Sequence, residues 1–228
     1  MKKVAVLQSN YIPWKGYFDL MNQVDVFIIY DEVQYTKNDW RNRNLIKTAK
    51  GLEWLSIPVK QQSLSQRIDE TFVSSTNWNK KHWNALVANY SKTPYFQEFS
   101  IRFKQLYERS ELINLSEINK AFINVVVDLL GINTLLVDSK TLNLTGDKNE
   151  RLLQAVQKVG GTHYVSGPAA SAYLNQKMFN DNQIDVSFIN YEGYQMYPQL
   201  HPPFEHGVSI LDLLFNNGPT SFTFINTK

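Results

Sequence analysis

Short apolar runs that stop at a polar residue alternate with helical patterns along the chain. The first run covers residues 4–7 and is followed by Gln8, and the second covers residues 26–30 and is followed by Asp31. A helical pattern follows Pro13 and separates the two runs. A strand, a helix and a second strand form a βαβ unit, whose ligand crevice lies at the carboxyl ends of the strands. We therefore expect Gln8 and Asp31 to lie at a ligand crevice.

The rest of the chain continues this alternation. Further strands are predicted at residues 54–59, 71–75, 133–137, 162–165 and 186–190, and helices begin near residues 79, 96, 116, 147 and 209. The pattern predicts an α/β fold with a Rossmann-like, mostly parallel sheet and helices on both faces. The three helices of residues 77–130 are expected to form a cap beside the cleft. Residues 1–228 are expected to form a single domain, because a 43% hydrophobic composition suffices for one sizeable core.

Composition and charge narrow the classes of function. The net charge of +2 is too small to indicate nucleic-acid binding by bulk electrostatics. No apolar stretch approaches the length of a membrane span, and the N-terminus lacks the apolar region of a signal peptide. We therefore expect no membrane insertion and predict a cytoplasmic location. The absence of cysteine excludes disulfides, thiolate metal sites and cysteine nucleophiles.

A dense polar cluster follows Asp31. It includes Gln34, Arg41, Asn42 and Arg43 beside aromatic residues. Arginine side chains bind phosphate and carboxylate groups in bidentate geometry. The cluster therefore predicts a clamp for a phosphate or a carboxylate, with Asp31 beside a hydroxyl or an amine. The alternative is a surface salt-bridge cluster in which Asn42 only caps a turn.

Two longer motifs give this region a family resemblance. They read QxxYxPWxGYF from residue 8 and DxFxxYDxVQYTKxDWxNRNxIK from residue 25. With further matches at residues 54–59, 90–96, 164–167 and 209–216, the sequence resembles the WbqC-like family of bacteria. That family is associated with O-antigen and other surface-polysaccharide gene clusters, so the resemblance implies a pathway more firmly than a reaction. It implies that Gln8, Tyr11 and Gly16 belong to a ligand loop after the first strand. The alternative is a turn that only needs a stop and a small residue.

A second ligand turn is predicted at the end of the strand at residues 162–165. Ser166 and Gly167 are small enough for close backbone approach, and the N–H groups of the following helix suit an anion. The alternative is an ordinary strand-to-helix turn capped by Ser166. The proline- and aromatic-rich segment 191–207 is long for a simple connection. Within it, Tyr197 is expected either to stack on a sugar or base or to pack in the core or rim.

Asp31, His201 and His206 are the candidate catalytic residues. Asp31 ends a strand at the expected crevice, and either histidine of segment 191–207 is an alternative proton acceptor. His201 and His206 are five residues apart and lack the helical HExxH spacing, so no metal site is predicted. The sequence identifies no cofactor.

The residues and the resemblance together predict an enzyme of surface-polysaccharide biosynthesis. Its predicted reaction transfers an acyl or aminoacyl group to a nucleotide-linked amino sugar, so its partners are a nucleotide-linked sugar and an acyl donor. A glycosyltransferase of the same pathway is an alternative, although the sequence contains no Asp-x-Asp motif. A non-catalytic accessory protein that binds sugars or nucleotides is a second alternative, because the many aromatic residues suit sugar stacking. No nucleic-acid partner is predicted, and a homo-oligomer is left open.

Overall fold

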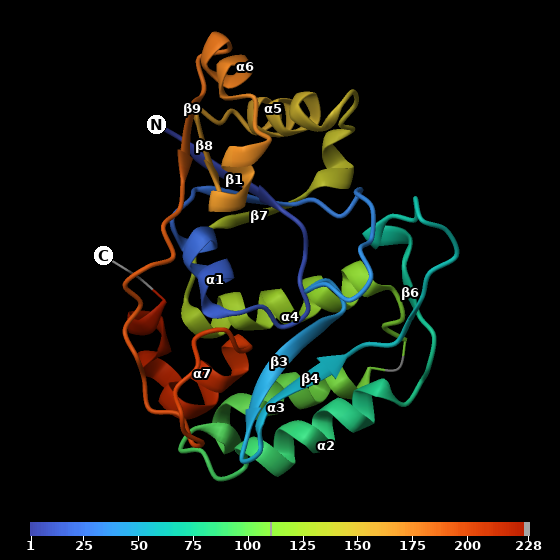
Figure 1. Cartoon of the computed structure of the whole chain (residues 1–228), viewed down its shortest axis with the longest axis vertical. Coiled ribbons are helices and arrows are strands. Elements are labelled where there is room, and N and C mark those ends of the chain that lie inside the picture. Colours follow the sequence, from blue (N-terminus) through green and yellow to red (C-terminus); the bar gives the residue numbers. More distant parts are fainter. Residues whose placement is uncertain (110, 226–228) are drawn as a thin grey trace.

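A five-stranded sheet lies at the centre of the computed structural model, which describes residues 1–109 and 111–225 (Figure 1). Its strands run in the order β7-β2-β1-β8-β9, and every pair is parallel. Their bounds are Lys3–Leu7 for β1, Val26–Ile29 for β2, Leu135–Asp138 for β7, His163–Ser166 for β8 and Asp185–Phe188 for β9. The predicted α/β fold with a parallel sheet is confirmed.

The order of the strands creates a topological switch point. From the central strand β1 the chain moves outward through β2 to β7, and it then crosses back to place β8 on the other side of β1. Val4 is therefore paired with Val26 on one side and with Tyr164 on the other. In sheets of this order, ligands bind outside the carboxyl ends of the strands where the direction reverses. Here that point lies beyond Leu7 and Ser166.

Helices cover both faces of the sheet because β1 and β2 are apolar on both sides. Val4 and Val6 face a core formed with α5 (Lys148–Lys158) and α6 (Gln176–Asp181). Ala5 and Phe27 face a larger core formed with α1 (Lys15–Asn22) and α4 (Leu115–Leu130). Figure 1 shows α5 and α6 above the sheet and α1 and α4 below it.

A second group of elements packs beyond α4 (Figure 1). It contains an antiparallel hairpin of β3 (Arg43–Thr48) and β4 (Gly51–Ser56), and the helices α2 (Trp78–Tyr90), α3 (Phe96–Glu108) and α7 (Ile210–Asn217). The short strands β5 (Val59–Lys60) and β6 (Phe72–Val73) form a separate pair. The predicted strand at 54–59 is wrong in extent, because β4 ends at Ser56 and Pro58, which has no N–H, separates it from β5.

The three helices of residues 77–130 have different surroundings. Helix α4 connects the second group to the sheet and buries Ile118, Phe122 and Val126 in the larger core. Helices α2 and α3 pack against each other, and α3 also packs against α7. Short 3₁₀ helices occur at Ile68–Glu70, Ser139–Leu142, Pro168–Ala172 and Gly218–Phe224. Within the described residues, no helix combines the length and apolar character that crossing a membrane requires.

Candidate functional site

A cavity of about 670 Å³ opens at the carboxyl ends of β1, β2 and β8. We call it the switch-point cavity. Loops after the three strands and the first turn of α5 supply most of its walls, and Arg67 comes from the loop after β5. The lining includes Leu7, Gln8, Glu32, Gln34, Arg41, Arg67, Gly146, Lys148, Arg151, Ser166, Gly167, Ala170 and Tyr173. The volume and the position at the reversal of strand order are those of a small-molecule site in an α/β protein.

Arg41 enters this cavity with neutral partners. Its Nη1 donates a 2.6 Å hydrogen bond to Oδ1 of Asn10, and its Nη2 donates a 3.2 Å bond to Oε1 of Gln8. The nearest carboxylate, that of Asp39, is 3.7 Å away. Asn119 fixes the backbone by donating to the Arg41 carbonyl at 2.8 Å. The guanidinium is therefore held in place while most of its charge remains available to an anion.

Lys148 and Arg151 bring two more positive charges from the start of α5. This helix begins with a capping box in which Asp147 accepts from the N–H groups of Asn149 and Glu150. Arg151 donates from Nε to the Gly146 carbonyl at 2.9 Å, and neither it nor Lys148 has an ion pair in the described part of the chain. Nζ of Lys148 lies 3.2 Å from the centroid of the Tyr173 ring, and burial lowers the pKa of Lys148.

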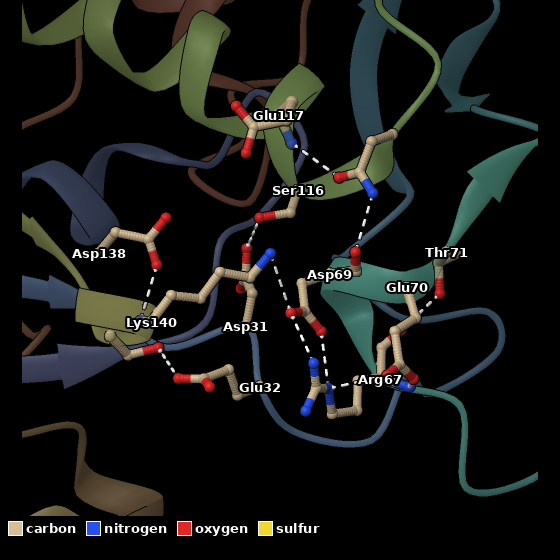
Figure 2. A network of polar contacts seen from close by, with 12 residues as sticks. Asp31, Glu32, Arg67, Asp69, Glu70, Thr71, Ser116, Glu117, Asp138 and Lys140 are labelled. Carbon is tan, nitrogen blue, oxygen red and sulfur yellow. Dashed lines mark hydrogen bonds and ion pairs between the residues drawn. The ribbon is translucent and has the colours of Figure 1, made fainter. Parts of the chain in front are cut away.

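Arg67 differs from these three cations because acidic groups neutralise it. Its Nε and Nη2 bind the two carboxylate oxygens of Asp69 at 2.9 and 3.0 Å, and Asp69 is also bound by Lys140 (Figure 2). Glu32 is the acidic side chain among the lining residues, and it accepts a 2.9 Å hydrogen bond from Ser139. The cavity wall thus carries two cations without an ion pair, Arg41 with a carboxylate no closer than 3.7 Å, and one acidic side chain, a balance that favours an anionic ligand.

Asp31 is not part of the cavity wall, although its neighbours Tyr30 and Glu32 line it. Its Oδ2 accepts from the Ser116 hydroxyl at 2.6 Å (Figure 2), and its Oδ1 accepts from the Ser9 N–H at 2.8 Å. The side chain is buried, and this burial raises its pKa against the opposing effect of the two hydrogen bonds. Asp31 therefore ties the loop after β1 and the first turn of α4 to the end of β2. Its predicted role as a proton acceptor stays a prediction.

The profile of the WbqC-like protein family matches residues 8–224, nearly the whole chain. The chain belongs to the WbqC-like protein family. The uncharacterized protein Rv1507c of Mycobacterium tuberculosis is 48% identical over 219 residues, which cover 96% of this chain and 95% of that protein. No solved structure matches the chain.

Two residues were predicted to bind a ligand in this WbqC-like protein: Tyr11, in the loop after β1, and Gly16, in the first turn of α1. Tyr11 instead points into the core, where its hydroxyl contacts Nδ1 of His82 at 2.9 Å and the Tyr107 hydroxyl at 2.6 Å. Gly16 is buried against Trp14, and a Cβ at Gly16 would lie 2.2 Å from Cζ2 of the indole. Neither residue lines the switch-point cavity.

A side chain outside the loop fixes its backbone. Ile12 adopts a φ of +38°, which is unfavourable for a β-branched residue. The side-chain amide of Asn44 donates to the carbonyls of Tyr11 and Ile12 at 3.1 and 2.8 Å. Asn44, on β3, therefore holds the loop in a conformation that the local sequence alone does not favour.

The predicted arginine clamp is not a single unit in the WbqC-like fold. Arg41 lines the cavity, whereas Arg43 is the first residue of β3 and its guanidinium lies 4.1 Å from the centroid of the Trp54 ring. Arg43 also donates to the Asn38 carbonyl. Asn42 is buried and donates to the Ile57 carbonyl at 2.8 Å, so it joins the loop to the chain beyond β4. Gln34 does line the cavity.

The turn after β8 lies where the sequence predicts it. Ser166 and Gly167 both line the switch-point cavity. A Cβ at Gly167 would meet only the Tyr191 hydroxyl, at 4.0 Å, so this glycine leaves space to the cavity rather than to the protein core. Whether either residue binds a ligand stays a prediction.

The aromatic segment 191–207 contacts the second group of elements, and in particular helix α7. The hydroxyl of Tyr197, which is buried, accepts from Nε2 of Gln199 at 3.2 Å, and the same nitrogen donates to Asp212 at 2.9 Å. The ring centroid of His206 is 4.5 Å from that of Phe204, and burial lowers the pKa of His206. His201, His206 and Tyr197 do not line the switch-point cavity.

Sequence reasoning did not single out Glu32, Lys148 and Arg151 as site residues. The available signals were an acidic residue directly after Asp31 and two cations within a turn of the Asp147 capping box. No trio of histidine, cysteine, aspartate or glutamate side chains is grouped to hold a metal ion anywhere in residues 1–109 or 111–225.

Proposed function

We propose that the switch-point cavity binds the diphosphate of a nucleotide-linked amino sugar, and that the protein transfers an acyl or aminoacyl group to the sugar amine. One observation carries the proposal. Arg41, Lys148 and Arg151 face one cavity at the reversal of strand order and have no neutralising partner closer than 3.7 Å among the described residues. A diphosphate is an anion of matching charge and suits guanidinium and ammonium donors.

The remaining walls suit the neutral parts of such a ligand. The Gln8 side chain is oriented by Arg41 and supplies an amide to the same space. Gly167 and Ala170 leave room at the end of β8. The ring of Tyr173 is 48% exposed and provides a surface on which a base or sugar can stack.

Glu32 is the proposed proton acceptor. The amine nitrogen of the sugar attacks the carbonyl carbon of the acyl donor, and a C–N bond forms. The bond from that carbon to the leaving group breaks, and a thiolate or phosphate departs with the electron pair. Glu32, the carboxylate of the cavity wall, takes the proton that the nitrogen loses. By resemblance to the family, the pathway proposed for this reaction is surface-polysaccharide biosynthesis.

A second candidate function is binding without catalysis. It is favoured because the cavity wall offers few groups that can transfer a proton. Glu32 is the acidic side chain there, and no histidine occurs among the lining residues. In this candidate the protein holds a nucleotide-linked sugar for a partner enzyme.

The two candidates are separated by a turnover assay with the Glu32→Gln variant. UDP-glucosamine and acetyl-coenzyme A serve as first probes, with mass-spectrometric detection of the N-acylated sugar and calorimetric measurement of nucleotide binding. The transfer proposal expects product from the wild type and a loss of about 10²–10⁴-fold in kcat for Glu32→Gln, with nucleotide affinity retained. Equal turnover in the variant would remove Glu32 from the mechanism. Binding without product from any amino-sugar nucleotide and acyl donor would favour the second candidate.

A further inference from the structure

A second cavity lies on the other side of the loop after β1. Its volume is about 350 Å³, and its walls are Asn10, Pro13, Trp14, Trp40, Asn44 and Gly207. We name it the indole cavity. None of these residues carries a charged side chain, in contrast to the switch-point cavity. The volume is at the lower end of the roughly 300–1,000 Å³ typical of small-molecule sites. We propose that the indole cavity binds a neutral saccharide.

Two indole rings give the cavity its apolar surface. Trp14 is fixed by Tyr191 and Tyr194, whose ring centroids are 5.2 and 5.9 Å from its own. Gly16 leaves the space that this indole occupies. Trp40 is 42% exposed. An indole presents a broad apolar face that packs against the C–H groups of a sugar ring.

The polar wall offers a free hydrogen-bond donor. Oδ1 of Asn10 accepts from Arg41 at 2.6 Å, whereas its NH₂ group has no partner in the described part of the chain. This bond fixes which end of the amide remains available, and the available end donates to a hydroxyl. The side-chain NH₂ of Asn44 already donates to the carbonyls of Tyr11 and Ile12, so Asn44 contributes to the shape of the cavity rather than a free donor.

The aromatic surface continues beyond the cavity. The ring centroid of Trp54 is 5.4 Å from that of Trp40, and Trp54 is equally exposed at 42%. Adjacent exposed indoles suit a ligand of more than one ring, so the occupant is assigned as a saccharide rather than a single nucleoside. The site is independent of the proposed transfer chemistry, because it requires only that a neutral ring enters this cavity.

The test is saturation-transfer difference NMR on the full chain, with glucose, N-acetylglucosamine, rhamnose and maltotriose as probes and adenosine as the competing arm. At least one saccharide is expected to receive saturation at its ring protons. Trp40→Ala and Asn10→Ala are expected to weaken that saccharide's Kd by up to about tenfold each, the effect of losing one stacking or hydrogen-bonding partner.

Two controls make the outcome specific. Trp54→Ala removes an equally exposed indole that does not line the cavity, so monosaccharide binding is expected to persist. Arg151→Ala alters only the switch-point cavity, so saccharide binding is expected to persist even if nucleotide binding is lost or was never present. Saturation of adenosine alone, of no probe at all, or of sugars equally in Trp40→Ala and wild type would overturn the proposal.

Discussion

The guanidinium of Arg41 and the side-chain amide of Asn10 join two cavities through one 2.6 Å hydrogen bond. Arg41 lines the switch-point cavity, and Asn10 lines the indole cavity. Because the acceptor is a neutral amide, the bond orients the guanidinium without cancelling its charge. The loop after β1 is thus the shared wall of a cationic site and a neutral site.

Changing Asn10 to aspartate tests whether that neutrality matters. Asn10→Asp keeps the size and the acceptor but places a carboxylate beside Arg41, so we expect about tenfold weaker binding of a nucleotide diphosphate, as measured by calorimetry. Asn10→Ala is the matched control, since it removes the acceptor and adds no charge beside Arg41. An affinity of Asn10→Asp equal to that of wild type would mean that Arg41 does not meet the anion.

Gly16 is expected to be intolerant of a methyl group. A Cβ would lie 2.2 Å from the Trp14 indole, so Gly16→Ala must displace that ring from its contacts with Tyr191 and Tyr194. We expect a loss of about 1–3 kcal/mol in the free energy of unfolding, measured with urea. Gly167→Ala is the control, because its Cβ meets only ordinary contact distances and its stability should match wild type. Equal stability of both variants would contradict the packing described for Trp14.

The free energy of unfolding is expected to rise at alkaline pH because of Lys15. The side chain is buried, its Nζ lies 4.8 Å from the centroid of the Tyr194 ring, and it donates to the Gln195 carbonyl at 3.1 Å. Burial lowers the pKa of Lys15 to about 8, from 10.5. Between these two values the unfolded chain holds the proton and the folded chain has lost it, so stability rises with pH.

The difference between wild type and Lys15→Met isolates this contribution. Methionine retains an apolar stem, and the ionisation of the buried tyrosines cancels in the difference. Urea unfolding at pH 7, 8 and 9 is expected to show the wild type gaining stability relative to Lys15→Met as the pH rises above about 8. Parallel pH curves would show that Lys15 titrates normally.

Asp31 is expected to make the free energy of unfolding fall, rather than rise, as the pH increases through the acidic range. Its pKa in the folded chain is raised above 3.8, so the folded state binds the proton more tightly. The resulting stabilisation is fully present below pH 3.8 and is lost as the pH rises through the folded pKa. Asp31→Asn lacks this dependence. It still accepts from the Ser9 N–H and can donate to Ser116, so we expect a cost below about 1 kcal/mol at pH 7.

Urea unfolding of both proteins from pH 3.5 to 7 measures this difference. The wild type is expected to lose stability relative to Asp31→Asn across that range. A variant that loses several kcal/mol at pH 7, with no pH-dependent difference, would show that the carboxylate charge itself is required by the fold.

The strands of the sheet and their carboxyl ends were predictable, because patterns in the local sequence encode them. The apolar runs before Gln8 and Asp31 form β1 and β2, and the Asp147 capping box begins α5 as its spacing predicts. Gln8 and Ser166 consequently line one cavity although they are distant in the sequence. The end of a strand is thus easier to predict than the role of the residue there, since Asp31 follows β2 but does not line the cavity.

The features that the sequence did not predict depend on contacts between distant segments. The hairpin strand β3 carries polar residues that only tertiary partners explain, such as Asn44 bound to the loop after β1 and the Lys47 N–H bound to the Tyr90 hydroxyl. Arg41 and Arg43 are two residues apart, yet one lies in a loop and the other in a strand, so they face different surroundings. Lys148 lines the same cavity as Arg41 only because the chain crosses back to place β8 beside β1.

Arg41, Lys148 and Arg151 together are proposed to bind a diphosphate. The most direct measurement is isothermal titration of UDP-, GDP- and dTDP-linked sugars into wild type and the Lys148→Ala/Arg151→Ala variant, at low and high salt. Arg102→Ala, which removes an exposed arginine paired with Asp128, is the matched control. We predict binding of at least one nucleotide sugar, weakened by salt and by about tenfold for each cation removed, with Arg102→Ala unchanged. Failure of every nucleotide sugar to bind, or equal affinity in the double variant, would contradict the account.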